Sequence, residues 1–290
     1  MKLPEIEYVR PATLDEAVRL LAEPDAKVLA GGQSLLPLMA YRLAAPRTLV
    51  DIGRLAELRR VRADAEGLAL GSLVRWRDIE NDPRIAAANP LLREAVNHVA
   101  HYQIRNRGTV GGSLAHADPA AELPAVALAC GAEIVAVGPA GRRVIEAADF
   151  FQAPLTTALE SDEIIVELRL PHWPSARRFV FEEFARRRGD FALAGVCLFY
   201  DLDSEGRIAS PRVAAFGVTE IQQRVPMLED HLTGRRLDEA ACAEAGEMAS
   251  VVIDAVEDMH APQDYRRSLF GTLVERALIR SMNDGGGHVH

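Results

Sequence analysis

The sequence predicts an α+β protein made of two small α/β units followed by a C-terminal unit with an antiparallel sheet. Before Pro171, apolar strand-like runs alternate with helical segments. Residues 171–177 contain two prolines and no periodicity, which is typical of a domain boundary. Beyond them, two strand-like runs flank a turn and two helical segments follow. We therefore expect subdomains at residues 1–55 and 56–171, a C-terminal domain at 178–282 and a flexible tail at 283–290.

The composition is that of a soluble globular protein. Hydrophobic residues fill 49% of the 290 positions and charged residues 26%, which suits a packed core and a wet surface. The net charge of -9 argues against nucleic-acid binding, because the chain has no surplus of cations to displace counterions from a phosphate backbone. No apolar run is long enough to span a membrane, and residues 1–11 lack the apolar core of a signal peptide. We expect a cytoplasmic protein.

The first unit begins with an amphipathic helix. Thr13-Leu14-Asp15-Glu16 has the spacing of a capping box, and apolar residues then recur at helical spacing up to Leu21. Residues 27–30 and 48–52 are short apolar runs that end at glycines, Gly31 and Gly53. Such runs are typical of buried strands. One helix and two strands are therefore predicted within the first 55 residues.

The second unit combines helices with further strands. It begins near Leu68, and residues 90–100 place apolar side chains along one side of a helix. Asp is favoured at a helix N-cap and Pro at the first helical position, so Asp118-Pro119 predicts the start of an apolar helix, which Gly131 ends. Residues 133–137 and 164–170 are strand-like and complete the unit.

The C-terminal unit is predicted to contain an antiparallel pair of strands and two helices. Residues 195–200 and 212–218 are strand-like runs on either side of the turn Asp203-Ser204-Glu205-Gly206. Residues 238–256 and 263–281 read as helices.

Two similar glycine pairs are the strongest functional signal. Ala30-Gly31-Gly32-Gln33-Ser34-Leu35 and Val110-Gly111-Gly112-Ser113-Leu114 lie 80 positions apart, and each has a hydroxyl side chain just beyond the glycines. Glycine adopts positive φ readily and lets backbone N–H groups approach an anion closely. Two such loops, one from each α/β unit, would clasp a diphosphate from both sides. The alternative is a pair of ordinary tight turns.

Several other kinds of site are not predicted. Neither glycine pair continues into G-x-S-x-G, which argues against a hydrolase nucleophile elbow. The sequence contains no P-loop, no G-x-G-x-x-G fingerprint and no H-E-x-x-H motif. No Ser-His-Asp or paired-carboxylate arrangement stands out, so we predict no catalytic side chain.

No metal site is predicted either. Cys130, Cys197 and Cys242 are too far apart for a Cys-x-x-Cys motif, and we expect them to be buried, reduced thiols. His98 and His101 lie three residues apart on a predicted helix but lack a third ligand. The histidines of the tail leave a metal-binding role open there.

His116 and Asp118 resemble an acid–base or metal pair. Their position just before a predicted helix favours a loop histidine and an N-cap aspartate over catalysis. Arg105 and Arg107, close to the second glycine pair, would help to neutralise phosphates or would simply be solvated.

Five short segments, taken in their order along the chain, resemble those of a known family. The segments are AGGQS at 30–34, IRNRGTVGGS at 104–113, ADPAAE at 117–122, GDFA at 189–192 and YRR at 265–267. Together they are similar to the FAD-binding medium subunit of the molybdenum hydroxylases, the family of the carbon monoxide dehydrogenase flavoprotein and of the flavin domain of xanthine dehydrogenase. The resemblance is collinear from about Pro4 to Arg280.

The resemblance implies a vanillyl-alcohol-oxidase-type fold, in which two α/β subdomains hold FAD and a C-terminal domain covers the flavin. The loops at 27–35 and 109–113 would bind the diphosphate and ribityl chain, and the 118–122 segment would lie near the adenosine or ribityl hydroxyls. Ile104 and Phe191 would lie near the flavin, and Ile165 would contact the adenine. The implied FAD-binding residues are Lys27, Val28, Leu29, Ala30, Gly31, Gly32, Gln33, Ser34, Leu35, Ile104, Thr109, Gly111, Gly112, Ser113, His116, Asp118, Glu122, Ile165 and Phe191.

The resemblance also implies a function. FAD would relay electrons from the iron–sulfur clusters of a small subunit to an acceptor such as NAD or a quinone, in an enzyme that also contains a molybdopterin large subunit. The assembly would be a doubled heterotrimer. Two other hypotheses stay open at this point: a self-sufficient FAD-dependent oxidoreductase acting on a small organic substrate, and a nucleotide-binding module that has lost its flavin.

Overall fold

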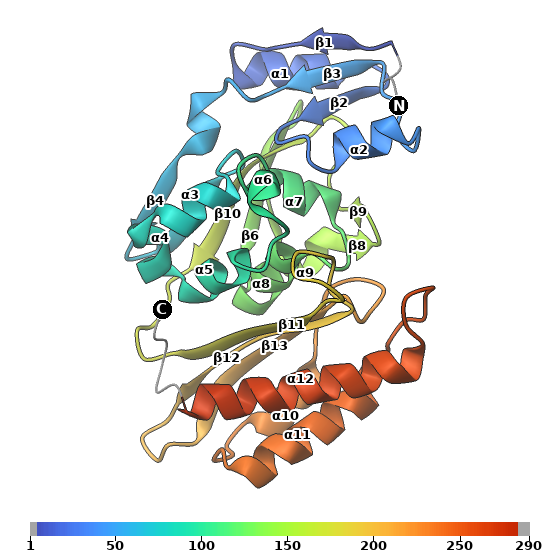
Figure 1. Cartoon of the computed structure of the whole chain (residues 1–290). Helices are drawn as coiled ribbons and strands as arrows, with labels where there is room; N and C mark the ends of the chain where they lie inside the picture. The colour runs from blue at the N-terminus through green and yellow to red at the C-terminus, as the bar shows by residue number, and fades with distance from the viewer. Residues whose placement is uncertain (1–4, 284–290) are drawn as a thin grey trace.

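The computed structural model describes residues 5–283 and contains three main sheets (Figure 1). The first sheet is parallel, with strand order β1-β3-β2. Its first helix starts as predicted, because the Thr13 hydroxyl accepts a hydrogen bond from the Glu16 amide (3.2 Å). The elements are β1 (Glu7–Val9), α1 (Leu14–Leu21), β2 (Ala26–Leu29), α2 (Leu35–Ala40), β3 (Thr48–Asp51) and the 3₁₀ helix η1 (Ala56–Arg59).

The second sheet has five strands in the order β4-β5-β10-β6-β7, and every neighbouring pair is antiparallel. Its strands are β4 (Val61–Asp64), β5 (Gly67–Gly71), β6 (Glu133–Gly138), β7 (Gly141–Glu146) and β10 (Ile164–Pro171). The hairpin of β8 (Phe151–Ala153) and β9 (Thr156–Thr157) adjoins it. Its helices are α3 (Trp76–Asn81), α4 (Pro83–Ala88), α5 (Pro90–Val96), α6 (Tyr102–Arg105), α7 (Val110–His116), α8 (Glu122–Cys130) and α9 (Ala147–Phe150).

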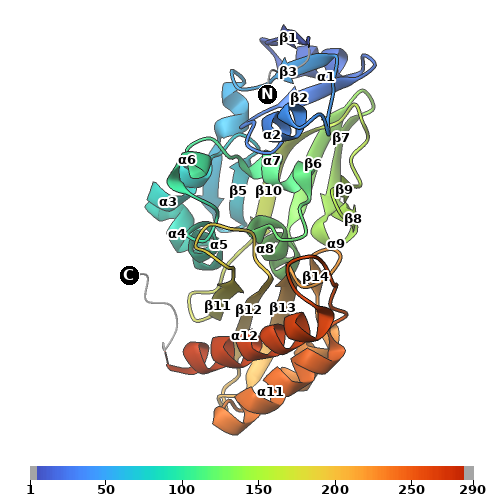
Figure 2. The same ribbon diagram turned by 45° about the vertical axis from the view of Figure 1, so that its right-hand side comes forward.

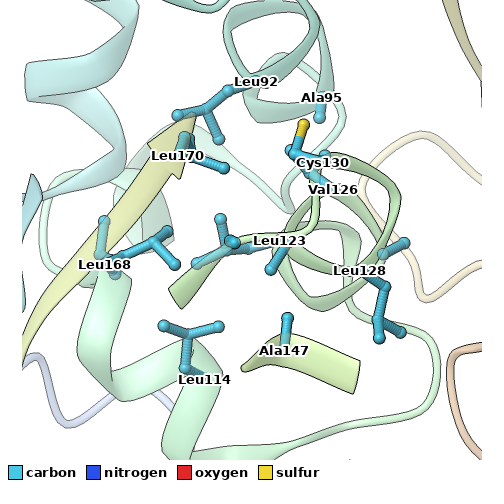
Figure 3. Packing of buried hydrophobic residues seen from close by; sticks show 14 of the residues in the cluster. Leu92, Ala95, Leu114, Leu123, Val126, Leu128, Cys130, Ala147, Leu168 and Leu170 are labelled. Atoms are coloured by element: carbon cyan, nitrogen blue, oxygen red, sulfur yellow. The ribbon is translucent and has the colours of Figure 1, made fainter. Parts of the chain in front are cut away.

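The central strand β10 contributes side chains to two different cores. Ile164 and Val166 pack with the first subdomain, against α1 and β3. Leu168 and Leu170 enter a larger core beneath α7 and α8, where Figure 3 shows them beside Leu123. A strand buried on both faces is expected to be continuously apolar, as β10 largely is. The second sheet is therefore covered by helices on one face and by the first subdomain on the other.

The C-terminal domain is an antiparallel sheet of order β11-β12-β13-β14 with helices packed on one side (Figure 2). Alternate residues of β12 divide between two cores: Cys197 and Phe199 face the second subdomain, while Val196 and Leu198 face the helices. The elements are β11 (Arg178–Phe184), β12 (Ala194–Leu202), β13 (Ile208–Phe216), β14 (Gln223–Arg224), α10 (Pro226–Leu232), α11 (Glu239–Val252) and α12 (Gln263–Asn283).

The α+β class and the antiparallel pair at β12 and β13 are confirmed, but several helix boundaries were wrong. Helix α8 begins at Glu122 rather than at Asp118, because the Asp118 carboxylate accepts a hydrogen bond from the Ala120 amide (2.9 Å) and closes a turn instead. Helix α5 ends at Val96, so His98 and His101 are not on a helix. Helix α11 ends at Val252, before residue 256. The domain boundaries at 55, 171 and 178 stay a prediction, and the histidine-rich tail lies outside the described residues.

Within residues 5–283, no helix combines the length and the hydropathy that crossing a membrane requires.

Candidate cofactor site

The first glycine pair connects β2 to α2 at the edge of the first subdomain. Gly32 has a φ of +72°, a conformation that a residue with a side chain adopts only with strain. A Cβ on Gly31 would overlap the carbonyl oxygen of Arg107 and would lie 3.1 Å from the Cα of Gly108. The first loop therefore lies directly against the backbone that precedes the second glycine pair. This arrangement agrees with the prediction that the two glycine-pair segments lie close together.

The first loop presents backbone donors that the protein does not use. Within residues 5–283, the N–H groups of Gln33 and Ser34 donate no hydrogen bond, and Ser34 does not cap α2 with its side chain. The Gln33 side chain instead donates to the carbonyl of Gly31 (3.0 Å), which holds the loop in shape. Backbone N–H groups left open in this way are suited to bind an anion.

The second glycine pair differs from the expected loop, because it forms the first turn of α7. The N–H of Gly111 donates to the carbonyl of Ser72 (2.8 Å). The Gly112 N–H donates to the hydroxyl of Thr109 (3.2 Å), and the Ser113 N–H donates to the Thr109 carbonyl (3.0 Å). The donors of the second pair are bonded within the protein in this structure, so the expectation that amides of both pairs clasp a diphosphate stays a prediction for the second pair.

The second pair instead provides close packing and space. A Cβ on Gly111 would lie 2.5 Å from Cβ of Ser72, so this glycine lets α7 pack tightly on the segment after β5. A Cβ on Gly112 would meet only the hydroxyl of its own N-cap, Thr109, at 2.9 Å. Beyond that contact the space over Gly112 is open, which leaves room for a ligand to approach the helix backbone.

A cavity of about 240 Å³ lies at the seam between the first two subdomains. It opens beside Ala30 and Gly31 and extends across the carboxyl ends of the parallel strands to Thr109. The lining contains four arginines and the carboxylate of Asp51. The arginines are Arg10, Arg59, Arg75 and Arg107. Arg10 is ion-paired with Asp51 (3.3 Å), and Arg59 donates to the carbonyl of Gly53 (2.9 Å). The cavity thus brings positive charge next to the first glycine loop of an acidic protein.

The segment from His116 to Glu122 is held by the C-terminal domain. The Gly217 N–H donates to the carbonyl of Pro119 (2.8 Å), and the Gln222 side chain donates to the carbonyl of Asp118. His116 ends α7 and its Nε2 lies 3.9 Å from the Asp118 carboxylate, too far for a hydrogen bond. Neither side chain has the geometry of a preformed acid–base pair.

Glu122 is the most perturbed carboxyl group of the predicted site. Burial, together with smaller contributions from the neighbouring charges of Glu183 and Asp118, raises the pKa of Glu122 from 4.5 to about 8. Part of the residue is exposed, but its carboxyl group lies within the protein. At neutral pH this group is therefore mostly protonated, and a protonated carboxyl group can donate a hydrogen bond.

Glu122→Gln is expected to stabilise the FAD-free protein at alkaline pH. The folded protein keeps a proton on Glu122 that the unfolded chain releases above pH 4.5, so this residue lowers stability as pH rises towards about 8. The variant should gain on the order of 5 kcal/mol over the parent above that pH and little near pH 4.5. Urea unfolding at both ends of this range measures the difference. An equal stability change at the two pH values would contradict the assignment.

The remaining predicted residues are spread around the seam. Ile165 is 4% exposed and belongs to the core beneath α7 and α8, so it offers little surface to a ligand. Phe191 is 68% exposed on the connection between β11 and β12. Ile104 is half-buried in α6, and Lys27 is exposed on β2. Arg105 is used within the protein, because it pairs with Glu80 (2.8 Å) and donates to the carbonyls of Val99 and Ala100.

Two polar residues of this region were missed by the sequence analysis. Glu183 on β11 has a buried oxygen with no hydrogen-bond partner among residues 5–283, and Arg266 on α12 is a buried cation. A lone acidic residue on a strand carries no motif, so nothing in the sequence pointed to Glu183. Arg266 stands in the YRR segment that supported the resemblance, but its role was not predicted.

Among the described residues, no group of three or more His, Cys, Asp or Glu side chains is arranged to hold a metal ion. Cys130, Cys197 and Cys242 are buried and unpaired.

Comparison with known proteins identifies a family for the whole chain. Residues 4–173 match the family described as the FAD binding domain in molybdopterin dehydrogenase, and residues 179–281 match the CO dehydrogenase flavoprotein C-terminal domain. The nicotine 6-hydroxylase medium subunit of Paenarthrobacter nicotinovorans is 40% identical over 97% of this chain and 99% of its own length. The carbon monoxide dehydrogenase medium chain of Hydrogenophaga pseudoflava is 36% identical over 95% of this chain and 96% of its own.

Solved structures agree with the sequence matches. A carbon monoxide dehydrogenase from Hydrogenophaga pseudoflava that lacks the Mo-pyranopterin moiety superposes with a TM-score of 0.94 at 36% identity, over 99% of this chain and 100% of that one. Quinoline 2-oxidoreductase from Pseudomonas putida 86 gives 0.94 at 37% identity, over 98% and 99%. The chain therefore belongs to the FAD-binding medium subunits of the molybdenum hydroxylase family, and is the flavoprotein subunit of a multi-subunit oxidoreductase.

Proposed function

We propose that this chain holds FAD in the seam between its first two subdomains and relays electrons through it, from iron–sulfur clusters of a partner subunit to an acceptor such as NAD⁺ or a quinone. The first glycine loop is the observation that carries the proposal. Its Gln33 and Ser34 amides donate no hydrogen bond to any described residue, and Gly31 brings them against the second subdomain. A diphosphate would provide oxygens that accept hydrogen bonds from these amides. Its negative charge would be neutralised by Arg75 and Arg107, which line the cavity.

The residues present fit a flavin dinucleotide in three further respects. The space over Gly112 is open to a ligand, the Glu122 carboxyl group is a buried donor, and an oxygen of Glu183 has no partner. FAD, when bound, exchanges electrons singly or in pairs, which suits a junction between one-electron clusters and a two-electron acceptor. The chain itself binds and orients the cofactor, and the C-terminal domain closes the site by holding the turn at residues 118–119.

The partners we propose are an iron–sulfur small subunit and a molybdopterin large subunit, in a doubled heterotrimer. The names of the relatives support this proposal, because they are medium subunits or medium chains of larger enzymes. The three cysteines of this chain are buried at separate places, so the clusters would be held by another chain. We place the complex in the cytoplasm, where unpaired thiols are expected. Substrate choice would belong to the large subunit.

Purification of the native complex tests the proposed function. The chain should co-purify with two other subunits, with iron and molybdenum, and with about one FAD per copy of this chain. Substrate should reduce the flavin only when all three subunits are present. Flavin reduction by a small organic substrate in the isolated chain would instead favour a self-sufficient oxidoreductase. A chain that remains colourless after incubation with FAD would contradict both.

Gly112→Val is expected to lower FAD affinity while leaving the fold intact. The added side chain would occupy the open space over the first turn of α7, where we place the cofactor backbone. We expect a loss of roughly tenfold or more in affinity, measured by titrating the FAD-free protein with FAD. Far-ultraviolet circular dichroism should be unchanged. Unaltered affinity would show that the cofactor does not pass over α7.

A further inference from the structure

Glu183 carries a buried oxygen that has no partner. Its side chain is 8% exposed, and within residues 5–283 its Oε2 makes no hydrogen bond. Oε1 lies 3.5 Å from Nδ1 of His98, which is longer than a normal hydrogen bond. A buried carboxylate oxygen without a partner costs folding free energy. Its presence points to a ligand that completes it.

The side chain of Glu183 projects from the C-terminal sheet towards the second subdomain. Alternate residues of a strand face opposite sides, and Phe181, two residues earlier on β11, packs in the core beneath α8. Glu182 faces the other side, where Arg280 of α12 pairs with it (2.8 Å). The charge of Glu183 is close enough to raise the pKa of Glu122, at the start of α8. Glu183 therefore lies where the C-terminal domain meets the 118–122 segment.

Among residues 5–283, no arginine or lysine forms a salt bridge with Glu183, whose one ion-pair contact is with His98. The titratable groups recorded near it are His98 after α5 and Glu122 on α8, and Asp118 lies near Glu122. Arg280, on the opposite side of β11, is already bound to Glu94 and Glu182. Two carboxyl groups thus lie close together between two domains, and the charge of Glu183 helps to raise the pKa of Glu122.

We propose that Oε2 of Glu183 accepts a hydrogen bond from the flavin half of FAD, and that the carboxyl pair of Glu122 and Glu183 lowers the reduction potential of the bound flavin. This inference rests on the proposed function. FAD offers the donors that a carboxylate needs, on its ribityl hydroxyls and at ring N3–H. Phe191, which the resemblance places near the isoalloxazine, lies on the connection that follows β11. A negative charge beside the ring opposes the addition of electrons to it.

The test compares Glu183→Gln with Glu182→Gln in the FAD-loaded protein. Both changes remove one carboxylate from β11, but Glu182 faces away from the second subdomain and is neutralised by Arg280. Spectroelectrochemical titration gives the flavin midpoint potential of each variant. Titration of the FAD-free protein with FAD gives the affinity, which does not depend on activity.

Glu183→Gln is expected to raise the ratio of reduced to oxidised flavin at a fixed potential by roughly tenfold, which is a shift of about 30 mV for a two-electron couple. Glu182→Gln should leave the ratio unchanged. Glu183→Asp, which keeps the charge but shortens the reach, should weaken FAD binding and leave the potential near that of the parent. An unchanged potential in FAD-loaded Glu183→Gln would overturn this inference and leave the proposed function standing. Failure of the parent protein to bind FAD would overturn both.

Discussion

Gly31→Ala is expected to reduce FAD affinity by roughly 100-fold or more. The new Cβ would overlap the carbonyl oxygen of Arg107, a backbone atom of the second subdomain that cannot move aside like a side chain. To remove this overlap the first loop must move away from the second subdomain, and the Gln33 and Ser34 amides would move with it. Overpacking of this kind typically costs about 1–3 kcal/mol and sometimes more. Titration of the FAD-free protein, followed by flavin fluorescence, measures the loss.

Gly234→Ala provides the matched control. Gly234 has a positive φ, of +77°, which Gly31 does not have, and a Cβ at Gly234 meets no atom within 4 Å. The control should lower stability by about 1 kcal/mol through backbone strain and leave FAD affinity unchanged. If Gly31→Ala bound FAD as tightly as this control, the close approach of the two subdomains would be irrelevant to the cofactor.

Arg266→Met is expected to produce the largest loss of stability, on the order of 3 kcal/mol. Arg266 is 3% exposed, and its guanidinium donates to the carbonyls of Leu193 (2.6 Å) and Gly217 (2.5 Å). It also pairs with the carboxylate of Asp258 (2.6 Å). Methionine fills similar space but leaves both carbonyls without a donor. Chemical denaturation of the FAD-free protein measures the effect.

The same variant should also loosen the cofactor site. Gly217 accepts from Arg266 through its carbonyl and donates to Pro119 through its N–H, so one residue joins α12 to the turn before α8. We expect FAD affinity to fall together with stability. Arg276→Met is the control, because Arg276 lies on the exposed side of the same helix. Equal effects of the two changes would rule out a specific role for Arg266.

The sequence predicted the first half of the site better than the second. The run of residues 27–30 into Gly31-Gly32 is local information, and the structure shows a strand, a tight connection and a helix there. The contact of Gly31 with the Arg107 carbonyl is not local, because it depends on how two subdomains pack. Only the repeated glycine pairs suggested that the two segments would meet.

Local patterns misled where a side chain had two possible partners. Asp118-Pro119 has the form of a helix start, but the Asp118 carboxylate closes a turn with Ala120 and α8 begins at Glu122. The Val110-Gly111-Gly112 segment has the form of a loop, but Thr109 caps it and makes it a helix. The raised pKa of Glu122 arises from burial and from Glu183 on a distant strand, and neither is visible in a sequence.

Amide hydrogen exchange of the chain with and without FAD tests the central claim most directly. The account places the FAD diphosphate on the unused amides of Gln33 and Ser34, while the amides of Gly111 and Ser113 are already bonded within the protein. FAD should therefore slow exchange strongly at residues 32–35 and much less at 111–113. Bound FAD that leaves exchange at residues 32–35 unchanged would contradict the account.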